Sequence, residues 1–351
     1  MKRQLYGKGN ERVDMEKVCV LGAGSWGTTL AALLAKNDKQ VALWGRVEDG
    51  VELMAKSREN VQFLPGIIIP DQVTPTIDIA AAIEGASLIV LSIPSQALRG
   101  VLVAIEKYLD KDICIVNTAK GLEITTGMRL SQLVEEILGQ EVRERFAVLS
   151  GPSHAEEVAR EIPTAVTVAA SCNDTAFLVQ DYFMSPTFRV YTNPDVAGVE
   201  LGGALKNIIA LAAGVAYGLG YGDNTMAALM TRGLTEIIRM GAAMGGDPRT
   251  FSGLSGMGDL VVTCGSRHSR NRRAGELIGQ GLSLEETLIR IGMVVEGAHT
   301  CRVVHKMALE MGIDMPITKA CYQVLYENRD PREGVGNLME RQKKHEIEEI
   351  T

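Results

Sequence analysis

The sequence predicts an α/β protein whose second half is helical, and three observations support this fold class. Short apolar runs alternate with helix-like stretches over residues 16–194. This alternation is typical of βαβ units, in which helices cover both faces of a parallel, doubly wound sheet. Strand-like runs stop near residue 194, and helix-like stretches continue to about residue 340. The length of 351 residues is sufficient for two such domains.

The apolar runs place the individual elements. The first strand is expected at KVCVL, residues 17–21, and the first helix at GTTLAALLAK, residues 27–36. Further strands are expected at 40–44 and within 87–95, 112–120 and 145–153, and the runs 163–170 and 188–193 could extend the sheet. Helices are expected within 195–220, 224–245, 269–281, 283–290, 296–312 and 315–328. We therefore expect a flexible extension at 1–15, a sheet domain at 16–194, a helical domain at 195–340 and a charged tail at 341–351.

Composition excludes several classes of protein. A net charge of −7 and a pI near 5.4 argue against a general nucleic-acid binder. The N-terminus lacks the apolar segment of a secretory signal, and the apolar run at 207–222 is too short to span a bilayer. The cysteines are widely spaced and form no CxxC pair, which favours reduced, mostly buried thiols: Cys19, Cys114, Cys172, Cys264, Cys301 and Cys321. We expect a cytoplasmic protein without a metal site or a membrane span.

A glycine motif follows the first expected strand. Gly22, Gly24 and Gly27 form G-x-G-x-x-G between that strand and a helix, which is the context in which the motif is informative. The first glycine permits a tight turn, the second lets the backbone approach a pyrophosphate, and the third lets the helix pack on the strand. The N–H groups of Ser25, Trp26 and Gly27 would then face an anion at a helix N-terminus. The motif predicts a dinucleotide site, and the alternative is a glycine turn without a ligand.

The residue after the second expected strand bears on the choice of dinucleotide. An acidic residue at this point binds the ribose of NAD, whereas an arginine can receive the 2′-phosphate of NADP. Here Arg46 follows the strand, and Glu48 and Asp49 come later. The sequence thus predicts that NADP(H) is used at least as well as NAD(H), unless Arg46 is only a surface residue.

Strand ends and buried helices carry further candidate residues. Lys120, and Gly151 with Ser153, follow expected strands at the edge where ligands bind in such sheets. Lys206 and Asn207 lie amid Gly, Ala, Leu and Ile. A buried lysine loses hydration, which lowers its pKa toward the range of a general base. A lysine that extends out of a helix end to solvent is the alternative.

A polar stretch in the second half predicts an anion site. Ser269 resembles the N-cap of a helix whose first turn contains Arg270 and Asn271, and a polarised helix end with an arginine suits a phosphate. A solvated basic face is the alternative. Asp259 follows a glycine-rich turn and resembles a helix N-cap, with Thr263 four residues later.

Together these motifs resemble one family. GAGSWGTTLA, AKGLE, SGPS, ELGGALKNIIALAAG, GLSGMGDLVVTC, SRNRR and VVEG occur in the order and spacing of bacterial NAD(P)-dependent sn-glycerol-3-phosphate dehydrogenases, over residues 17 to 340. The segment before Met15 departs from the family, as does Ser153, where threonine is common. The resemblance implies a Rossmann-type domain, an all-α substrate domain, a homodimer and a role in supplying glycerol 3-phosphate for phospholipid synthesis.

The resemblance also implies roles for individual residues. Lys206 matches the proton acceptor, with Lys120 and Asp259 as the other catalytic candidates. Substrate contacts are implied at Lys120, Gly151, Ser153, Lys206, Asn207, Asp259, Thr263, Ser269, Arg270 and Asn271. Contacts to NAD(H) or NADP(H) are implied at Gly22, Gly24, Ser25, Trp26, Gly27, Arg46, Lys120, Ala155, Arg270, Val294 and Glu296. Rival interpretations are a dehydrogenase of hydroxy acids or sugar phosphates on the same architecture, and a dinucleotide-sensing protein without catalysis.

Overall fold

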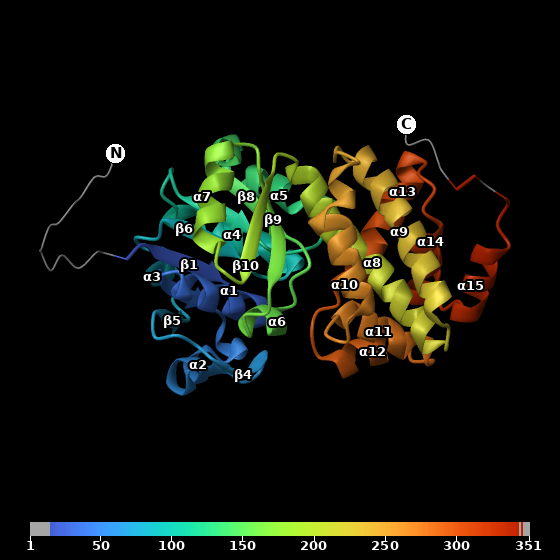
Figure 1. Ribbon diagram of the computed structural model, residues 1–351, viewed down its shortest axis with the longest axis horizontal. Coiled ribbons are helices and arrows are strands. Elements are labelled where there is room, and N and C mark those ends of the chain that lie inside the picture. Colours follow the sequence, from blue (N-terminus) through green and yellow to red (C-terminus); the bar gives the residue numbers. More distant parts are fainter. Residues whose placement is uncertain (1–14, 344, 347–351) are drawn as a thin grey trace, which may run out of the picture.

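The computed structural model of the protein describes residues 15–343, 345 and 346, and its two halves lie side by side along the long axis (Figure 1). The predicted extension lies outside the described residues except for Met15. Of the predicted charged tail, residue 344 and residues 347–351 lie outside them as well.

The first half contains a sheet of eight strands in the order β10-β9-β8-β7-β6-β1-β2-β5. The strands are β1 (Lys17–Leu21), β2 (Gln40–Trp44), β5 (Val73–Thr76), β6 (Leu88–Leu91), β7 (Cys114–Asn117), β8 (Phe146–Ser150), β9 (Thr164–Ala170) and β10 (Phe188–Asn193). A two-stranded hairpin of β3 (Glu59–Asn60) and β4 (Leu64–Ile68) stands apart from this sheet. Strands β7, β6, β1 and β2 are neighbours in this order and run parallel to one another. The C-terminal ends of β1, β6 and β7 therefore lie at the same edge of the sheet.

One expectation about this sheet requires correction. The runs at 163–170 and 188–193 do extend the sheet, as β9 and β10, but β9 runs antiparallel to β8, and β10 runs parallel to β9. The sheet is therefore mixed rather than wholly parallel. The helix between β8 and β9, α6 (Ala155–Ala159), has only five residues. It is too short to carry the chain back across the sheet, which a parallel connection would require.

Helices cover both faces of the sheet. They are α1 (Ser25–Lys36), α2 (Val51–Ser57), α3 (Ile79–Ile83), α4 (Leu98–Ile105), α5 (Leu130–Leu138) and α7 (Asn173–Phe183). On one face, Leu34 of α1 and Phe183 of α7 pack with Val20 of β1. On the other face, Leu102 of α4 and Leu133 of α5 pack against the same strands. Since side chains alternate along a strand, the central strands supply both cores, as β1 does with Val20 and Leu21.

The second half is built around one long helix, α8 (Val196–Gly218). In the described part of the chain seven α-helices follow it: α9 (Asp223–Ala243), α10 (Asp259–Gly265), α11 (Arg270–Gly279), α12 (Leu284–Ile291), α13 (Glu296–Met311), α14 (Pro316–Tyr326) and α15 (Pro331–Met339). Among the described helices, only α8 is long and apolar enough to cross a membrane, and 83% of its apolar stretch is buried. The surrounding helices cover it, so α8 is the core helix of this half (Figure 1).

Helices α8 and α11 pack with their backbones in contact. A Cβ atom at Gly214 of α8 would lie 2.0 Å from the carbonyl oxygen of Arg272, and one at Gly275 of α11 would lie 2.0 Å from that of Leu211. Real side chains never approach so closely, so both positions require glycine. The absence of side chains at this crossing fixes how α8 lies against α11.

A buried carboxylate connects the two halves. Glu200 of α8 accepts hydrogen bonds from the backbone N–H of Ser131 at 2.8 Å and from its hydroxyl at 2.5 Å, and it pairs with Arg129 at 2.9 Å. It therefore caps the first turn of α5, which belongs to the sheet domain. Its burial raises its pKa against the opposing effects of Arg129 and Ser131.

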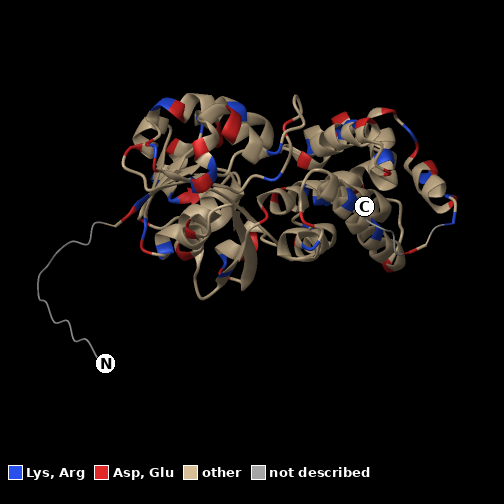
Figure 2. Ribbon diagram, turned by 90° about the horizontal axis from the view of Figure 1, so that it is seen from above, with Lys and Arg blue, Asp and Glu red and all other residues tan. Residues whose placement is uncertain are grey.

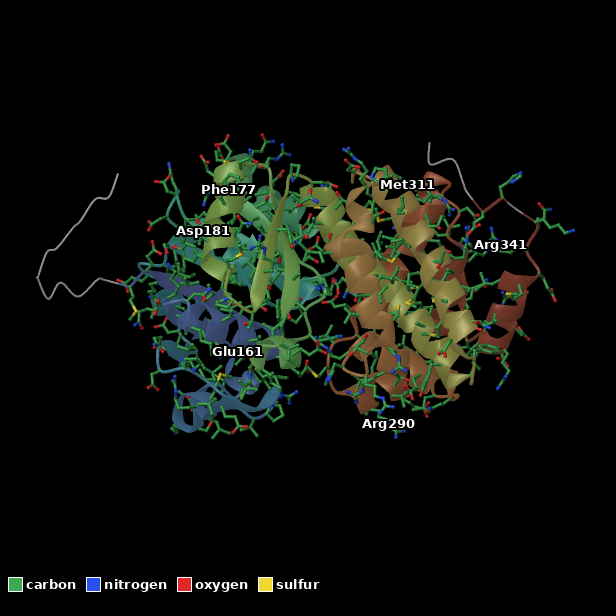
Figure 3. The ribbon with its side chains drawn as sticks, viewed as in Figure 1. Glu161, Phe177, Asp181, Arg290, Met311 and Arg341 are labelled. Carbon is green, nitrogen blue, oxygen red and sulfur yellow. The ribbon has the colours of Figure 1, made fainter. Side chains whose placement is uncertain are left out.

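The surface carries mixed charge. Lys and Arg are interspersed with Asp and Glu over both halves (Figure 2). Exposed apolar side chains are scattered, as with Phe177 on α7 and Met311 at the end of α13 (Figure 3). All six cysteines are free, and only Cys172 is not buried.

Candidate active site

The glycine motif forms a tight turn whose shape depends on its glycines. Gly22 has φ +117°, and a Cβ there would lie 2.2 Å from the carbonyl oxygen of Ser92, which follows β6. A Cβ at Gly27 would lie 1.8 Å from the carbonyl oxygen of Gly22. A Cβ at Gly24, by contrast, would meet no atom within 4 Å. Gly22 and Gly27 are thus required by the protein itself, whereas Gly24 borders open space that a ligand could enter.

Helix α1 begins within this turn, at Ser25, and no side chain caps it. The N–H groups of a first helical turn lack intrahelical acceptors, and the helix dipole makes this end positive. An open approach at Gly24 and an uncapped helix N-terminus together fit the pyrophosphate of a dinucleotide. Trp26, in the same turn, is half-buried and packs against the sheet core.

Arg46 lies two residues beyond the end of β2, as predicted. Its guanidinium forms an ion pair with Asp49 at 2.9 Å, and its side chain is 66% exposed. The Arg46 N–H also donates to the Asp49 carboxylate at 2.9 Å. This ion pair, formed within one turn of chain, holds Arg46 beside the sheet edge next to the glycine motif. Glu48 in the same turn is exposed.

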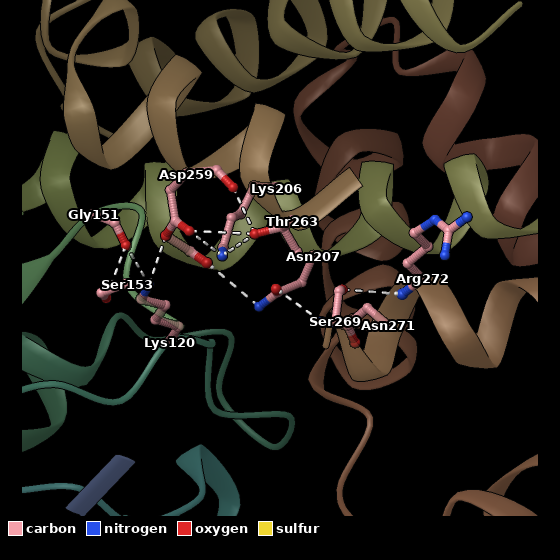
Figure 4. Close-up of polar contacts among 11 residues, drawn as sticks. Lys120, Gly151, Ser153, Lys206, Asn207, Asp259, Thr263, Ser269, Asn271 and Arg272 are labelled. Carbon is pink, nitrogen blue, oxygen red and sulfur yellow. Dashed lines mark hydrogen bonds and ion pairs between the residues drawn. The ribbon is translucent and has the colours of Figure 1, made fainter. Parts of the chain in front are cut away.

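A cluster of two lysines and one aspartate lies where the two halves meet, with Lys206 and Asp259 buried and Lys120 half-buried (Figure 4). Lys206 Nζ lies 2.5 Å from Asp259 Oδ1 and 2.6 Å from Thr263 Oγ1. Lys120 Nζ, from the sheet domain, lies 2.6 Å from Asp259 Oδ2. Lys206 is 5% exposed and Asp259 is 1% exposed. One carboxylate therefore joins a lysine of each half.

Burial and charge set the protonation of this cluster. Burial lowers the pKa of Lys206 to about 8; the Lys120 charge also lowers it, and Asp259 opposes the shift. For Asp259, burial alone would raise the pKa, but Lys120 and Lys206 outweigh it and the pKa falls. Asp259 is therefore ionised, and Lys206 can lose a proton near neutral pH.

One alternative and one prediction from the sequence are wrong. Lys206 does not extend to solvent from a helix end, because it lies in the middle of α8 and is buried. Asp259 does not cap a helix: it is the first residue of α10, Gly258 occupies the N-cap, and no side-chain cap is formed. The attraction of two ammonium groups directs this carboxylate into the protein, and local sequence does not reveal that attraction.

The ends of β7 and β8 bring the other sheet-domain candidates to this cluster. Lys120 donates a second hydrogen bond to the carbonyl of Gly151 at 3.1 Å, and the Ser153 hydroxyl donates to the same carbonyl at 3.1 Å. Lys120, Gly151 and Ser153 therefore lie together, beside Asp259, as Figure 4 shows.

The predicted anion site at the start of α11 is partly built as expected. Ser269 caps the helix by accepting from the Arg272 N–H at 3.2 Å. Asn271 donates to Asn207 of α8 at 2.9 Å and accepts from the Gly297 N–H of α13 at 2.8 Å, so it ties three helices together. Arg270 is exposed in the first turn.

The neighbouring Arg272 points elsewhere. It is 7% exposed, and its guanidinium lies 4.4 Å from the ring centre of Tyr217 on α8. Of these two arginines, only Arg270 remains exposed at the helix start.

The remaining predicted cofactor contacts come from both halves, and Glu296 links the two. The Glu296 carboxylate accepts from the Ser95 N–H at 3.0 Å and from the Ser95 hydroxyl at 2.7 Å. The carbonyl of Val294 accepts from Arg270 at 3.4 Å, and that of Ala155 accepts from the Thr29 hydroxyl of α1 at 3.2 Å. Sequence reasoning missed Ser95, although its position just after a strand and Pro94 was the available signal.

Titratable groups elsewhere in the described residues are not grouped like metal ligands. In this part of the chain no three His, Cys, Asp or Glu side chains are placed to hold a metal ion. The candidate site consists of Lys120, Lys206 and Asp259, together with the uncapped N-terminus of α1 and the N-terminus of α11.

A mixed, mainly parallel sheet with a glycine turn, joined to a helical half by the ion pairs of Lys120 and the buried Lys206 with Asp259, is typical of dinucleotide-dependent oxidoreductases. Residues 17–176 match the N-terminal part, and residues 195–336 the C-terminal part, of the NAD-dependent glycerol-3-phosphate dehydrogenases. The chain belongs to the NAD(P)-dependent glycerol-3-phosphate dehydrogenase family.

Individual proteins agree with this assignment. The chain is 68% identical to the glycerol-3-phosphate dehydrogenase [NAD(P)+] of Syntrophomonas wolfei over 96% of its length and 98% of that protein. It is 56% identical to that of Moorella thermoacetica over 95% of its length and 98% of that protein. The crystal structure of glycerol-3-phosphate dehydrogenase from Coxiella burnetii superposes with a TM-score of 0.89 at 39% identity, covering 93% of this chain and 99% of that one.

Proposed function

We propose that this chain interconverts sn-glycerol 3-phosphate and dihydroxyacetone phosphate with NAD(P)(H), the reaction for which its family is named. The observation that carries the proposal is the buried Lys206, whose pKa of about 8 lies near neutrality and which is linked through Asp259 to Lys120. A general base functions best when its pKa is close to the working pH. The bound nicotinamide supplies hydride exchange at substrate C2.

Lys206 acts as the proton acceptor in the oxidation. Its neutral amine takes the proton of the C2 hydroxyl as the hydride leaves C2, and in the reduction its ammonium returns that proton. Asp259 and Thr263 hold the Nζ atom in place through the bonds of 2.5 and 2.6 Å. Lys120, on the other oxygen of Asp259, is placed to stabilise negative charge that develops on the C2 oxygen.

The start of α11 anchors the phosphate of the substrate. The first-turn N–H groups and Arg270 attract a dianion, and Asn271 fixes this turn to α8, which carries Lys206. Binding energy at the phosphate then positions C2 against the Lys206 amine. Gly151, Ser153 and Asn207 complete the contacts that we assign to the substrate.

Cofactor binding is assigned to the glycine turn and its neighbours. Arg46 receives the 2′-phosphate of NADP, so NADP(H) is used at least as well as NAD(H). Ser25 and Trp26 hold the pyrophosphate, and Ala155, Val294 and Glu296 contact the cofactor at the junction. We keep the division near residue 194 between the cofactor domain and the substrate domain.

The chain is a soluble enzyme, and we propose that it works in the cytoplasm as a homodimer that supplies glycerol 3-phosphate for phospholipid synthesis. Light scattering on the purified protein tests the dimer, because a monomeric mass at micromolar concentration contradicts it.

Steady-state turnover tests the main proposal. Dihydroxyacetone phosphate is supplied with NADPH and, in parallel, with NADH, and consumption of the reduced cofactor is followed. We expect turnover with both, and oxidation of glycerol 3-phosphate in the reverse assay. Turnover of 3-hydroxy acids or 6-phosphogluconate in its place contradicts the proposed substrate. Cofactor binding without any turnover favours a dinucleotide sensor instead.

A further inference from the structure

His154 lies beside the proposed active site, but neither the motif nor the mechanism above uses it. It immediately precedes α6 and follows Ser153, at the end of the loop that leaves β8. The hydrogen bond from Thr29 to the carbonyl of Ala155 holds this point of the chain against α1. The backbone that carries His154 is therefore tied to the helix of the cofactor turn.

The His154 ring reaches toward the helical half. Its centre lies 5.8 Å from that of His268, which is in the loop between α10 and α11, directly before the cap Ser269. His268 Nδ1 in turn lies 4.0 Å from the carboxylate of Glu156, two residues after His154 in the chain. The imidazole thus lies between the loop after β8 and the loop that leads into the phosphate site.

The Nε2 atom of His154 is buried and has no hydrogen-bond partner in the described part of the chain. A buried polar atom without a partner is unfavourable, and such atoms are rare in folded proteins. At a site formed between two domains, a group that arrives with the substrate can supply the missing partner.

The surroundings keep this imidazole neutral. Burial lowers the pKa of His154, and the Lys206 ammonium lowers it further, against Glu156, Asp259 and Glu157. A neutral imidazole carries one donor and one acceptor nitrogen. A phosphate dianion binds more strongly to cationic side chains than to a neutral ring. A hydroxyl group, which both donates and accepts, is the chemical partner that suits it.

We propose that His154 Nε2 binds the C1 hydroxyl of the three-carbon substrate and is a specificity-determining residue. The inference rests on the proposed function, in which α11 holds the phosphate on C3, and Lys206 and Lys120 face the oxygen on C2. That assignment pairs the phosphate and the C2 oxygen with named side chains and pairs none with the C1 hydroxyl. Two side chains near the cluster carry a buried polar atom without a partner, Ser150 at the end of β8 and His154; of these, only His154 extends to the loop before α11.

A substrate that lacks this hydroxyl provides the test. Hydroxyacetone phosphate is dihydroxyacetone phosphate with a methyl group in place of the C1 alcohol. His154→Phe keeps an aromatic ring against His268 and removes both nitrogens. We expect kcat/KM for dihydroxyacetone phosphate to fall roughly tenfold in this variant, as for a lost buried hydrogen bond, and kcat/KM for hydroxyacetone phosphate to change less than about twofold.

Two further variants make the result specific. His154→Gln places an amide near the position of Nε2, and we expect it to recover part of the preference for dihydroxyacetone phosphate. His305→Phe is the matched control, because His305 stacks on Tyr322 within the helical half at 4.1 Å between ring centres. It should leave the preference between the two substrates unchanged.

The remaining outcomes contradict the proposal. Equal losses for both substrates in His154→Phe indicate that the ring contacts the phosphate or only packs. An unchanged preference in both His154 variants, with wild-type NADPH affinity, shows that His154 does not bind the hydroxyl. A wild-type enzyme inactive on dihydroxyacetone phosphate contradicts the proposed function itself, so the two failures are distinguishable.

Discussion

The glycine turn of the sheet domain and the lysine–aspartate cluster at the junction meet opposite requirements. The turn depends on the absence of side chains, with Gly22 and Gly27 in contact with backbone carbonyls. The cluster depends on three charged side chains, which come from the loop between β7 and α5, from α8 and from α10. Burial of any one of these charges without its partners would be unfavourable. Steric change should therefore disrupt the first region, and change of charge the second.

Removing the proton acceptor gives the largest expected effect. Lys206→Ala should lower kcat by at least ~10²-fold, the low end for loss of general acid–base catalysis, because no other described amine lies as close to Asp259 Oδ1. The affinity for NADPH, measured by fluorescence titration, should stay near that of the wild type, since the glycine turn is unchanged. A kcat within a few-fold of the wild type contradicts the role of Lys206.

Two substitutions in the turn separate steric fit from ligand access. Gly27→Ala should destabilise the protein by roughly 1–3 kcal/mol, because the new methyl group overlaps the carbonyl of Gly22. Gly24→Ala should leave the stability nearly unchanged and weaken NADPH binding, because its methyl group enters open space. Thermal unfolding with and without NADPH measures both effects. A destabilised Gly24→Ala protein, or one with normal NADPH affinity, would show that Gly24 does not border the cofactor.

The pH dependence tests the charged region alone. With a Lys206 pKa of about 8, the rate of oxidation needs the neutral amine and should fall about tenfold per pH unit below that value. The reduction needs the ammonium, so its rate should decline above the same pH. Asp259 raises the pKa of Lys206, so Asp259→Asn should move both midpoints to lower pH. Profiles of kcat whose midpoints stay in place in Asp259→Asn argue against this coupling.

The smallest effect is expected at Arg46, whose guanidinium is largely exposed. Arg46→Ala should raise KM for NADPH by a few-fold to about tenfold and leave KM for NADH nearly unchanged, because a solvated charge pair contributes only about 0–1 kcal/mol and a phosphate contact somewhat more. The test is to measure KM for NADPH and for NADH in both the wild type and Arg46→Ala. Equal changes for the two cofactors would show that Arg46 does not recognise the 2′-phosphate.

Much of the fold was predictable because its signals are local. The strand at 17–21, the glycine turn and the cap at Ser269 each depend on neighbours a few residues away, and the family motifs indicated which distant residues form the site. The direction of β9, by contrast, depends on the short connection through α6 as it packs in the folded sheet.

The orientations of Asp259, Arg272 and Glu200 were not predictable from sequence for the same reason. Asp259 responds to Lys120 and Lys206, Arg272 to the ring of Tyr217, and Glu200 to the first turn of α5. Each of these partners is remote in sequence. Neighbouring residues alone therefore suggest only a helix cap, an exposed face or an ordinary core position for Asp259, Arg272 and Glu200.

The backbone contact between α8 and α11 has a consequence for substrate length. Gly214 and Gly275 prevent either helix from sliding along the other without a clash or a gap. Lys206 is on one of these helices, and the Arg270 turn is on the other. The separation between the amine and the phosphate anchor is thus set by main-chain geometry, so a phosphate ester with one more carbon between its phosphate and its alcohol would be held out of register with the amine.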